Sequence, residues 1–484
     1  MKKITVFCAS FALAFVFSCK TVPPVVPVDA ASVPVKGDAA PPRVENDART
    51  PAVSAVEAAL TGIVEQLSAG NFDKALDLFD TLDSEERDKS EIRLLKASVY
   101  LSAGRREEAK AAAEAISAAE PKNIQALIVR AAVEEAAGRT REQKALLDQI
   151  IRLEPDNVDA LVSLGNLANR GSSYRTAGSY YDKALALSPD NGNALLGRAW
   201  VYRTNKDPKN AEQLLTRAVA AHPRWASPLH ERGRVYKSAG HFREALADLD
   251  KAQSLDPDNY FIACDRGDTL VTLNRRQEAL EEFGKAIAIN PGYFLAYAYR
   301  AGIRDQLNDF DAAIADYEQV VRLNSDYYYA YEGLGMLYMK KENWFAARDA
   351  FTQMYNKAPH DQVSYGLLAA LCWMKGGKPQ DPKAFLEQVI RKAKRDTIEW
   401  WVLRLYHDLA GDGDIAFRID KENNLALKSR MLFYLASYYD ARGNKNLADR
   451  FYLRVHEMGI NTILEWRLNE WAVESRGLNP GAHT

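Results

Sequence analysis

Small and apolar residues recur along this 484-residue chain with a period of 34. Frames counted from Val56 carry a small residue at the eighth position and alanine at the twentieth. The small residues are Ala97, Ala131, Gly165, Ala199, Gly233, Gly267, Ala301 and Gly335, and the alanines are Ala75, Ala109, Ala177, Ala211, Ala245, Ala279, Ala313 and Ala347. Small side chains at both places allow two helices to approach closely. Each frame therefore predicts a helix, a turn and a second helix, and a fixed period of this length is typical of stacked repeats.

Proline marks the thirty-second position of six successive frames, at Pro121, Pro155, Pro189, Pro223, Pro257 and Pro291. The combined pattern resembles the tetratricopeptide repeat family over residues 56–375. The resemblance implies an all-α solenoid, a right-handed superhelix of antiparallel helix pairs whose first helices line the concave side. Units are expected to begin at residues 56, 90, 124, 158, 192, 226, 260, 294 and 328, with a partial unit from 362.

The repeat register breaks at Gly376, and residues 376–484 predict a divergent helical region. This region is expected to hold a last pair of the same type near 429–460 and then a capping helix, because terminal repeats need a polar outer face. Two departures inside the array predict looser packing. Ile63 occupies the eighth position of the first repeat, and Gln143 occupies the alanine position of the third repeat.

The N-terminus predicts export and a lipid anchor. Lys2 and Lys3 precede an apolar run, residues 4–17, which is short for a bilayer span and fits a secretory signal. The stretch Val16-Phe17-Ser18-Cys19 resembles the relaxed signals of spirochaetal lipoproteins, which implies a signal peptide over 1–18 and a lipid on Cys19. An ordinary signal peptide with an incidental cysteine is the alternative. We expect a protein of the bacterial outer membrane, with its periplasmic or surface orientation open.

Composition adds a tether and excludes several function classes. Residues 19–55 are rich in proline, alanine and valine and predict a semi-extended linker. Lysine and arginine total 63 against 65 aspartate and glutamate, so no attraction to nucleic acid is expected. The sequence contains no phosphate-binding loop, nucleophile elbow or zinc motif. No enzyme activity, cofactor or metal site is expected, and Cys264 and Cys372 predict no disulfide.

Arginine recurs at the seventh position, which in this family points toward the second helix. Three of these arginines face an acid at the twenty-third position, so we expect pairs within one repeat: Arg232 with Asp248, Arg266 with Glu282 and Arg300 with Asp316. Arg130 and Arg198 have no such acid and stay unassigned. An anion-binding ladder is the alternative.

The candidate ligand surface comes from the second, fifth, ninth, twelfth and thirteenth positions, which face the concave side in the family. The fourth to sixth repeats supply a basic set: Asn166, Asn169, Arg170, Trp200, Arg203, His230, Arg234 and Lys237. The next three repeats supply an acidic and aromatic set: Phe261, Asp268, Asp305, Tyr329, Glu332, Met336 and Met339. A solvated helical face is the alternative for the basic set.

Two functions fit these predictions. In one, the chain is a non-catalytic, membrane-anchored scaffold that holds a peptide or partner protein in its concave groove, as this family commonly does. In the other, it is a surface adhesin whose basic residues bind an anionic host polysaccharide such as a glycosaminoglycan, or a host protein. Lipid anchoring and the basic set favour the adhesin, whereas the aromatic and methionine residues favour the scaffold.

Overall fold

The computed structural model describes residues 55–358, 362–377 and 382–478, and that part of the chain forms helices and no strand. The chain divides into two compact units, one ending at Thr269 and the other beginning at Leu270. The expected signal peptide 1–18, Cys19 and the tether up to residue 54 lie outside the described residues. Ala55, the last residue of the expected tether, is the first residue of helix α2.

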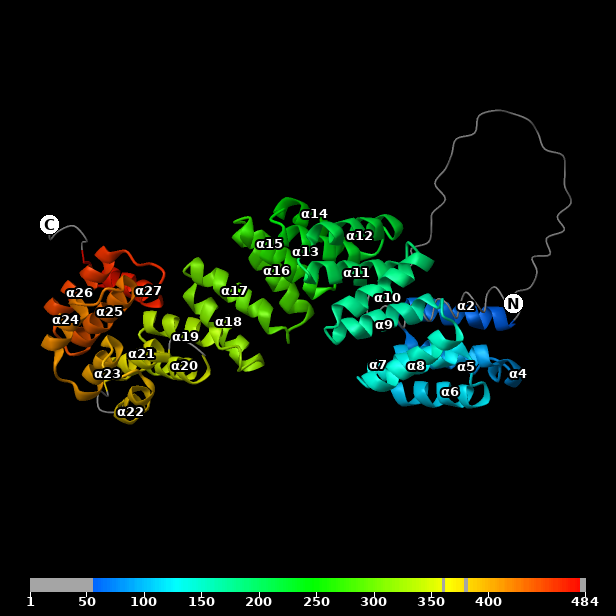
Figure 1. Ribbon diagram of the computed structural model, residues 1–484, viewed down its shortest axis with the longest axis horizontal. Helices are drawn as coiled ribbons and strands as arrows, with labels where there is room; N and C mark the ends of the chain where they lie inside the picture. The colour runs from blue at the N-terminus through cyan, green and yellow to red at the C-terminus, as the bar shows by residue number, and fades with distance from the viewer. Residues whose placement is uncertain (1–54, 359–361, 378–381, 479–484) are drawn as a thin grey trace, which may run out of the picture. The chain divides into compact units, whose positions relative to one another are not determined.

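The first unit is a succession of helix pairs (Figure 1). Its helices are α2 (Ala55–Ser68), α3 (Phe72–Phe79), α4 (Ser84–Arg87), α5 (Ser90–Ser102), α6 (Arg106–Ala119), α7 (Ile124–Ala136), α8 (Thr140–Leu153), α9 (Val158–Arg170), α10 (Tyr174–Leu187), α11 (Gly192–Thr204), α12 (Pro208–Ala221), α13 (Ala226–Ser238), α14 (Phe242–Leu255) and most of α15 (Tyr260–Thr272). From α5 to α15, the first helix of each pair begins at the first residue of its 34-residue frame. The short helix α4 is an addition that the period did not predict.

The second unit continues the pairs and ends in a denser set of helices. Its members are the end of α15, α16 (Arg276–Ile289), α17 (Phe294–Gln306), α18 (Phe310–Leu323), α19 (Tyr329–Lys340), α20 (Trp344–Lys357), α21 (Gln362–Lys375), α22 (Lys383–Lys392), α23 (Ile398–Asp408), α24 (Asp412–Asp420), α25 (Leu425–Ala441), α26 (Lys445–Met458) and α27 (Leu464–Ser475). Helices α25 and α26 occupy the place of the expected last pair, and α27 that of the expected capping helix.

Helix boundaries follow from local chemistry. Asn123, Asn157 and Asn191 each stand two residues after a repeat proline, and each accepts a hydrogen bond from a backbone N–H of the first helical turn at 2.9–3.0 Å. Inside each pair, the fifteenth residue of the frame adopts a left-handed conformation that ends the first helix. These residues are Gly70, Gly104, Gly138, Ser172, Lys206, Gly240, Asn274, Asn308 and Glu342.

A large side chain at the twenty-fourth position packs against the small residue at the eighth. A Cβ atom on Gly165 would lie 2.6 Å from a ring atom of Tyr181, and one on Gly335 would lie 2.7 Å from Phe351. Because real Cβ atoms do not approach so closely, only glycine fits opposite these rings. The Tyr181 ring also packs against the sixth residue of the following frame, since a Cβ on Gly197 would lie 2.4 Å from Tyr181.

The sequence predicted looser packing in the repeat that begins at residue 56, and this prediction is wrong. Ile63 is fully buried, in a cluster with Phe79 and Leu95, because the larger side chain fills space that the eighth-position alanine leaves elsewhere.

Candidate functional site

The basic set lies on three successive first helices of the first unit. Helix α9 carries Asn166, Asn169 and Arg170, α11 carries Trp200 and Arg203, and α13 carries His230, Arg234 and Lys237. We call these eight residues the first-unit surface. Helices α9, α11 and α13 are the first helices of successive repeats, so residues at the same repeat position lie next to one another in the stack.

Acidic side chains neutralise the cations of this surface. Glu231 lies 2.9 Å from Arg234 and 3.5 Å from Arg203, measured between the guanidinium nitrogens and the carboxylate oxygens. Asp265 on α15 accepts from His230 at 2.7 Å. The surface is therefore not a basic patch, which corrects the expectation from sequence.

Asp265 also joins two further cations to the same group. It lies 3.6 Å from Arg234 and 3.7 Å from Lys237, and Lys237 donates in addition to Asp268. We call Arg203, His230, Glu231, Arg234, Lys237, Asp265 and Asp268 the charge network. Apart from His230, three cations of the network face three carboxylates, and their formal charges cancel.

Burial gives this network its electrostatic character. The side chains of His230, Glu231 and Asp265 are 13%, 19% and 25% exposed, so water screens their interactions only in part. Burial acts to raise the pKa of the Asp265 carboxyl, but the hydrogen bond and charge of His230, together with the charges of Arg234 and Lys237, hold that pKa below its usual value. Burial lowers the pKa of the Arg203 guanidinium.

Glu231 and Asp265 were not predicted because both occupy the sixth position, which was not among the concave positions. A partial signal was present. The preceding frames carry Leu215 and Leu249 at the twenty-fourth position, where five other frames carry a ring. Where that ring is Tyr181 or Tyr317, the sixth residue that follows is glycine. Leu215 and Leu249 are each followed by a carboxylate, although Leu147 is followed by Ser163. A side chain larger than glycine fits at the sixth position when no ring presses against it.

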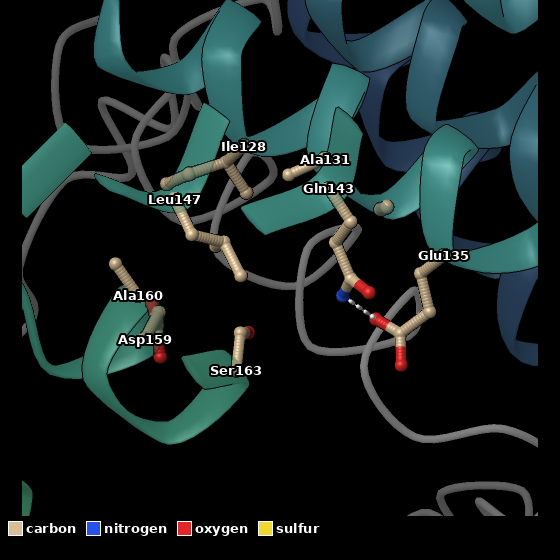
Figure 2. A pocket seen from close by; sticks show the side chains of 9 residues that line it. Ile128, Ala131, Glu135, Gln143, Leu147, Asp159, Ala160 and Ser163 are labelled. Atoms are coloured by element: carbon tan, nitrogen blue, oxygen red, sulfur yellow. Dashed lines mark hydrogen bonds between the residues drawn. The ribbon is translucent and has the colours of Figure 1, made fainter. Parts of the chain in front are cut away.

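Arg170 belongs to a second polar group, centred on Gln143. Arg170 donates to Glu135 at 2.6 Å and to the Gln143 side-chain oxygen at 3.0 Å. Gln143 in turn donates to Glu135 at 3.0 Å, the hydrogen bond drawn in Figure 2. Gln143 is 1% exposed. Because Glu135, Gln143 and Arg170 lie on α7, α8 and α9, their hydrogen bonds hold these three helices together. Arg170 is thus engaged in joining repeats, which its assignment to a ligand surface did not anticipate.

The expected looser packing around Gln143 is confirmed in part, by a small cavity beside it, although its amide is buried and hydrogen-bonded. A cavity of about 10 Å³ lies beside Gln143 and is lined by Ile128, Leu147 and Ser163, among other side chains drawn in Figure 2. The buried Ser163 hydroxyl has no hydrogen-bond partner among the described residues. The cavity has room for about one water molecule.

Trp200 and the two asparagines complete the first-unit surface. Trp200 is half-buried, with the Tyr174 ring centroid at 5.6 Å and the Arg203 guanidinium at 6.0 Å from its own ring centroid. Asn166 accepts a hydrogen bond from the Tyr181 hydroxyl at 2.7 Å, which orients its amide nitrogen away from that ring. The side-chain oxygen of Asn169 has no hydrogen-bond partner within the described part of the chain.

The acidic and aromatic set is not one surface. In the second unit Tyr329 is 55% exposed, whereas Met336 is 6% exposed and Met339 packs on the same apolar core. Met336 is therefore not accessible to a ligand, because it belongs to the apolar core of the second unit. Glu332 accepts from the Tyr365 hydroxyl at 2.5 Å. In the first unit, Phe261 is 47% exposed and Asp268 belongs to the charge network.

Asp305, the remaining member of the acidic set, is paired over a long sequence distance. Both of its carboxylate oxygens accept from Arg467 on α27, at 2.7 and 2.6 Å. Its side chain is 13% exposed, so little of it stays accessible.

Ion pairs are formed by the seventh-position residues Arg198, Arg232, Arg266 and Arg300. The expected pairs of Arg232 and Arg300 are confirmed, and the expected pair of Arg266 with Glu282 stays a prediction. Arg232 pairs with Asp248 at 2.7 and 2.8 Å, and Arg300 pairs with Asp316 at 2.8 and 2.7 Å. Arg266 donates to Asp250 at 2.5 Å, an acid of the preceding repeat.

Arg198, left unassigned by the sequence, donates to Asp182 at 2.8 Å, again in the preceding repeat. Asp182 and Asp250 both occupy the twenty-fifth position. These arginines therefore join helices of adjacent repeats, and the anion ladder loses its support.

Within the described residues, no cluster of three metal-ligating side chains is found and no helix is long and apolar enough to cross a membrane. Cys264 and Cys372 are buried free thiols, and burial raises the pKa of both, that of Cys264 to about 12. A protonated, buried thiol is a poor nucleophile.

Solved structures with similar helix arrangements include several repeat proteins. The Cut9–Hcn1 hetero-tetramer of the APC/C is 16% identical with a TM-score of 0.49, covering 65% of this chain and 62% of the solved one. The type IV pilus biogenesis factor PilW is 24% identical with a TM-score of 0.39, covering 42% and 94%. YrrB, described as a repeat protein with an unusual peptide-binding site, is 23% identical with a TM-score of 0.31, covering 38% and 95%. No curated relative matches.

Family models give the assignment. Four models, each described as the tetratricopeptide repeat, match residues 66–133, 133–192, 172–230, 226–259, 262–293 and 300–361. Together these ranges cover more than half of the chain. The chain belongs to the tetratricopeptide repeat family.

Proposed function

We propose that this chain is a non-catalytic interaction scaffold and that the first-unit surface binds an extended segment of a partner protein. The observation that carries this proposal is the charge network beside Trp200. It offers carboxylates and cations in contact with one another, which suits a peptide with side chains of both signs. Trp200 offers an apolar anchor, and the side-chain amide nitrogens of Asn166 and Asn169 can donate hydrogen bonds to the carbonyl groups of a peptide backbone.

The network also weighs against an anionic polysaccharide as the ligand. A sulfated chain presents only negative groups, and it would meet Glu231, Asp265 and Asp268 together with the cations. Like charges brought together at partly buried sites disfavour binding. We therefore propose the scaffold, and binding of a glycosaminoglycan becomes an outcome that its test can detect.

We further propose that the scaffold acts at the bacterial cell envelope, held by a lipid on Cys19. Support comes from the basic start at Lys2 and Lys3, the apolar run 4–17 and the proline-rich segment that follows. Two or more acyl chains are enough for stable attachment without a spanning helix. The repeat array would then stand away from the membrane on its tether.

Peptide display on the full chain tests the scaffold. We expect selected peptides to carry both acidic and basic residues around an apolar one. Their affinity should fall roughly tenfold for Trp200→Ala, the size of a strong interface contact. Arg243→Ala, on the exposed side of α14, is the matched control and should leave affinity unchanged.

Two results would contradict the scaffold. One is enrichment of peptides that bind Trp200→Ala as well as the unaltered chain. The other is tight binding of heparin at physiological salt, lost when Arg203, Arg234 and Lys237 are neutralised, because that result would restore the polysaccharide function.

The anchor has a separate test. Cells carrying Cys19→Ala should release the protein from the membrane fraction and lose incorporation of labelled palmitate. Retention in the membrane together with the label would refute acylation at Cys19.

A further inference from the structure

Helix α27 has two chemically different faces. One face carries Glu465, Leu468, Asn469 and Val473, which are 0–6% exposed. The opposite face carries Arg467, Trp471 and Glu474, at the spacing that places three side chains in one row along a helix. A terminal cap needs only the first face, so the second requires its own explanation.

The buried face holds α27 to α25 and α26. Glu465 accepts from the Tyr434 hydroxyl at 2.7 Å, and the Asn469 side-chain nitrogen donates to the Tyr452 carbonyl at 3.1 Å. Burial strongly raises the pKa of Tyr434, so its hydroxyl stays a donor. These buried contacts fix α27 as a permanent member of the C-terminal helices.

The row of Arg467, Trp471 and Glu474 contacts a different part of the second unit. Arg467 makes its two hydrogen bonds to Asp305 at the end of α17. The Trp471 ring centroid lies 6.0 Å from that of Phe310 on α18, in an edge-to-face arrangement, and 5.2 Å from the Lys340 ammonium on α19. Glu474 lies 3.3 Å from Lys340.

The residues that receive this row belong to the ligand side of the repeats. Asp305 and Lys340 occupy the twelfth and thirteenth positions of adjacent frames, which face the concave side in this family. We call Asp305, Phe310 and Lys340 the receiving site. A carboxylate, an aromatic edge and an ammonium, set on three successive helices, match a guanidinium, an indole and a carboxylate spaced over two turns of a helix.

We propose that the receiving site binds an amphipathic helix and that α27 fills it as a built-in competitor. The external ligand is a helix of a partner protein with arginine and tryptophan four residues apart on one face. The proposal rests on the scaffold function and names the partner class for the second unit. A partner gains access only when the Arg467–Asp305 contact opens.

The two faces of α27 make such opening feasible. The buried face stays attached, and only the row of Arg467, Trp471 and Glu474 has to separate from the receiving site. This separation also withdraws the half-buried Trp471 ring from the apolar core of the second unit. Arg467 is 37% exposed and Glu474 is 74% exposed, so water can replace part of the contact. Because α27 belongs to the same chain, its effective concentration is high, and it should suppress weak external helices.

A labelled helical peptide tests the proposal on the full chain. The peptide carries arginine, tryptophan and glutamate at the spacing of Arg467, Trp471 and Glu474, with alanine and lysine elsewhere, so it cannot replace the buried face. The unaltered chain should bind it weakly. The double variant Arg467→Ala, Trp471→Ala should bind it at least roughly tenfold more tightly, because the receiving site is vacated.

Controls separate this result from unfolding. Circular dichroism and thermal melting of the double variant should show that the helices are retained, and Arg467→Lys alone should give an intermediate affinity. Arg454→Ala, which removes an ion pair of α26 with Asp420 outside the receiving site, should leave peptide affinity unchanged. Adding Asp305→Ala to the double variant should abolish binding.

Absence of binding to a folded double variant, or binding that ignores Asp305, would overturn the proposal and leave α27 a permanent cap. The peptide selections at Trp200 of the first unit do not depend on this outcome, so failure here is distinguishable from failure of the scaffold function.

Discussion

Arg203 in the first unit and Asp305 in the second occupy the same repeat position but find partners in different ways. Arg203 meets Glu231 of the next repeat, whereas Asp305 meets Arg467, which is 162 residues away. The first unit thus satisfies its concave charges between neighbouring repeats. The second satisfies an equivalent charge with a helix from outside the regular array.

The apolar cores of the two units differ in the same sense. The core of the first unit is divided among clusters that each span one or two repeats, such as the one joining Leu127, Ile150 and Leu164. One cluster in the second unit runs from Met336 to Val473. Nearest-neighbour contacts stabilise the first unit, and a shared core stabilises much of the second.

Overpacking a glycine at the same repeat position in each unit tests this difference most strongly. Gly165→Leu and Gly335→Leu both force a side chain against a ring, and each should lower the free energy of unfolding by about 3 kcal/mol or more. Hydrogen exchange should show lost protection near α9–α11 in the first variant. In the second, the loss should reach α25.

Gly413→Ala is the control, because a Cβ there meets nothing within 4 Å. It should leave stability nearly unchanged. Equal spreading of the damage in the two leucine variants would show that the two cores do not differ in cooperativity.

Removing one carboxylate from each unit should have a smaller effect. Asp265→Ala deprives His230, Arg234 and Lys237 of a partner, and Asp305→Ala deprives Arg467, so each should lower stability by about 1–2 kcal/mol. Exchange should rise around α13 and α15 for the first and at α17 and α27 for the second. Unchanged exchange at α27 in Asp305→Ala would show that the long-range contact contributes nothing to stability.

Acid should weaken the first unit through Asp265. Its pKa in the folded chain lies below the usual 3.8, so its contribution is present above that value and is lost as the pH falls through the folded pKa. Hydrogen exchange of α13 and α15 between about pH 5 and pH 3 should therefore rise more in the unaltered chain than in Asp265→Asn. The same acid response in both chains would place the titrating group elsewhere.

Relieving a strained turn should give the smallest effect and the opposite sign. Lys206 and Glu342 adopt φ values of 60° and 57° at a position where other repeats carry glycine. Lys206→Gly and Glu342→Gly should each raise stability by about 0.5–1 kcal/mol, since glycine avoids the left-handed penalty but loses more chain entropy. Thermal melting measures both, and a decrease in either variant would mean that the lysine or glutamate side chain stabilises its turn.

The sequence allowed the repeat array to be predicted well and the candidate site only in part. Helix starts, small-to-large packing and the pairs Arg232–Asp248 and Arg300–Asp316 follow from residues with fixed spacing in one frame. The charge network did not follow, because Glu231 and Asp265 stand at a position that faces a neighbouring ring in other repeats. Met336 was assigned to a ligand surface by its repeat position, yet it is buried in the apolar core of the second unit.

By itself, the sequence determined the period, the helix pairs and which positions must be small, because these depend on residues within one repeat or in adjacent ones. The tertiary structure alone decided which charges meet and which concave residues stay accessible. Ion pairs form only where side-chain atoms come within about 4 Å. A 34-residue period brings Arg203 to Glu231, but only the folded C-terminal helices bring Arg467 to Asp305.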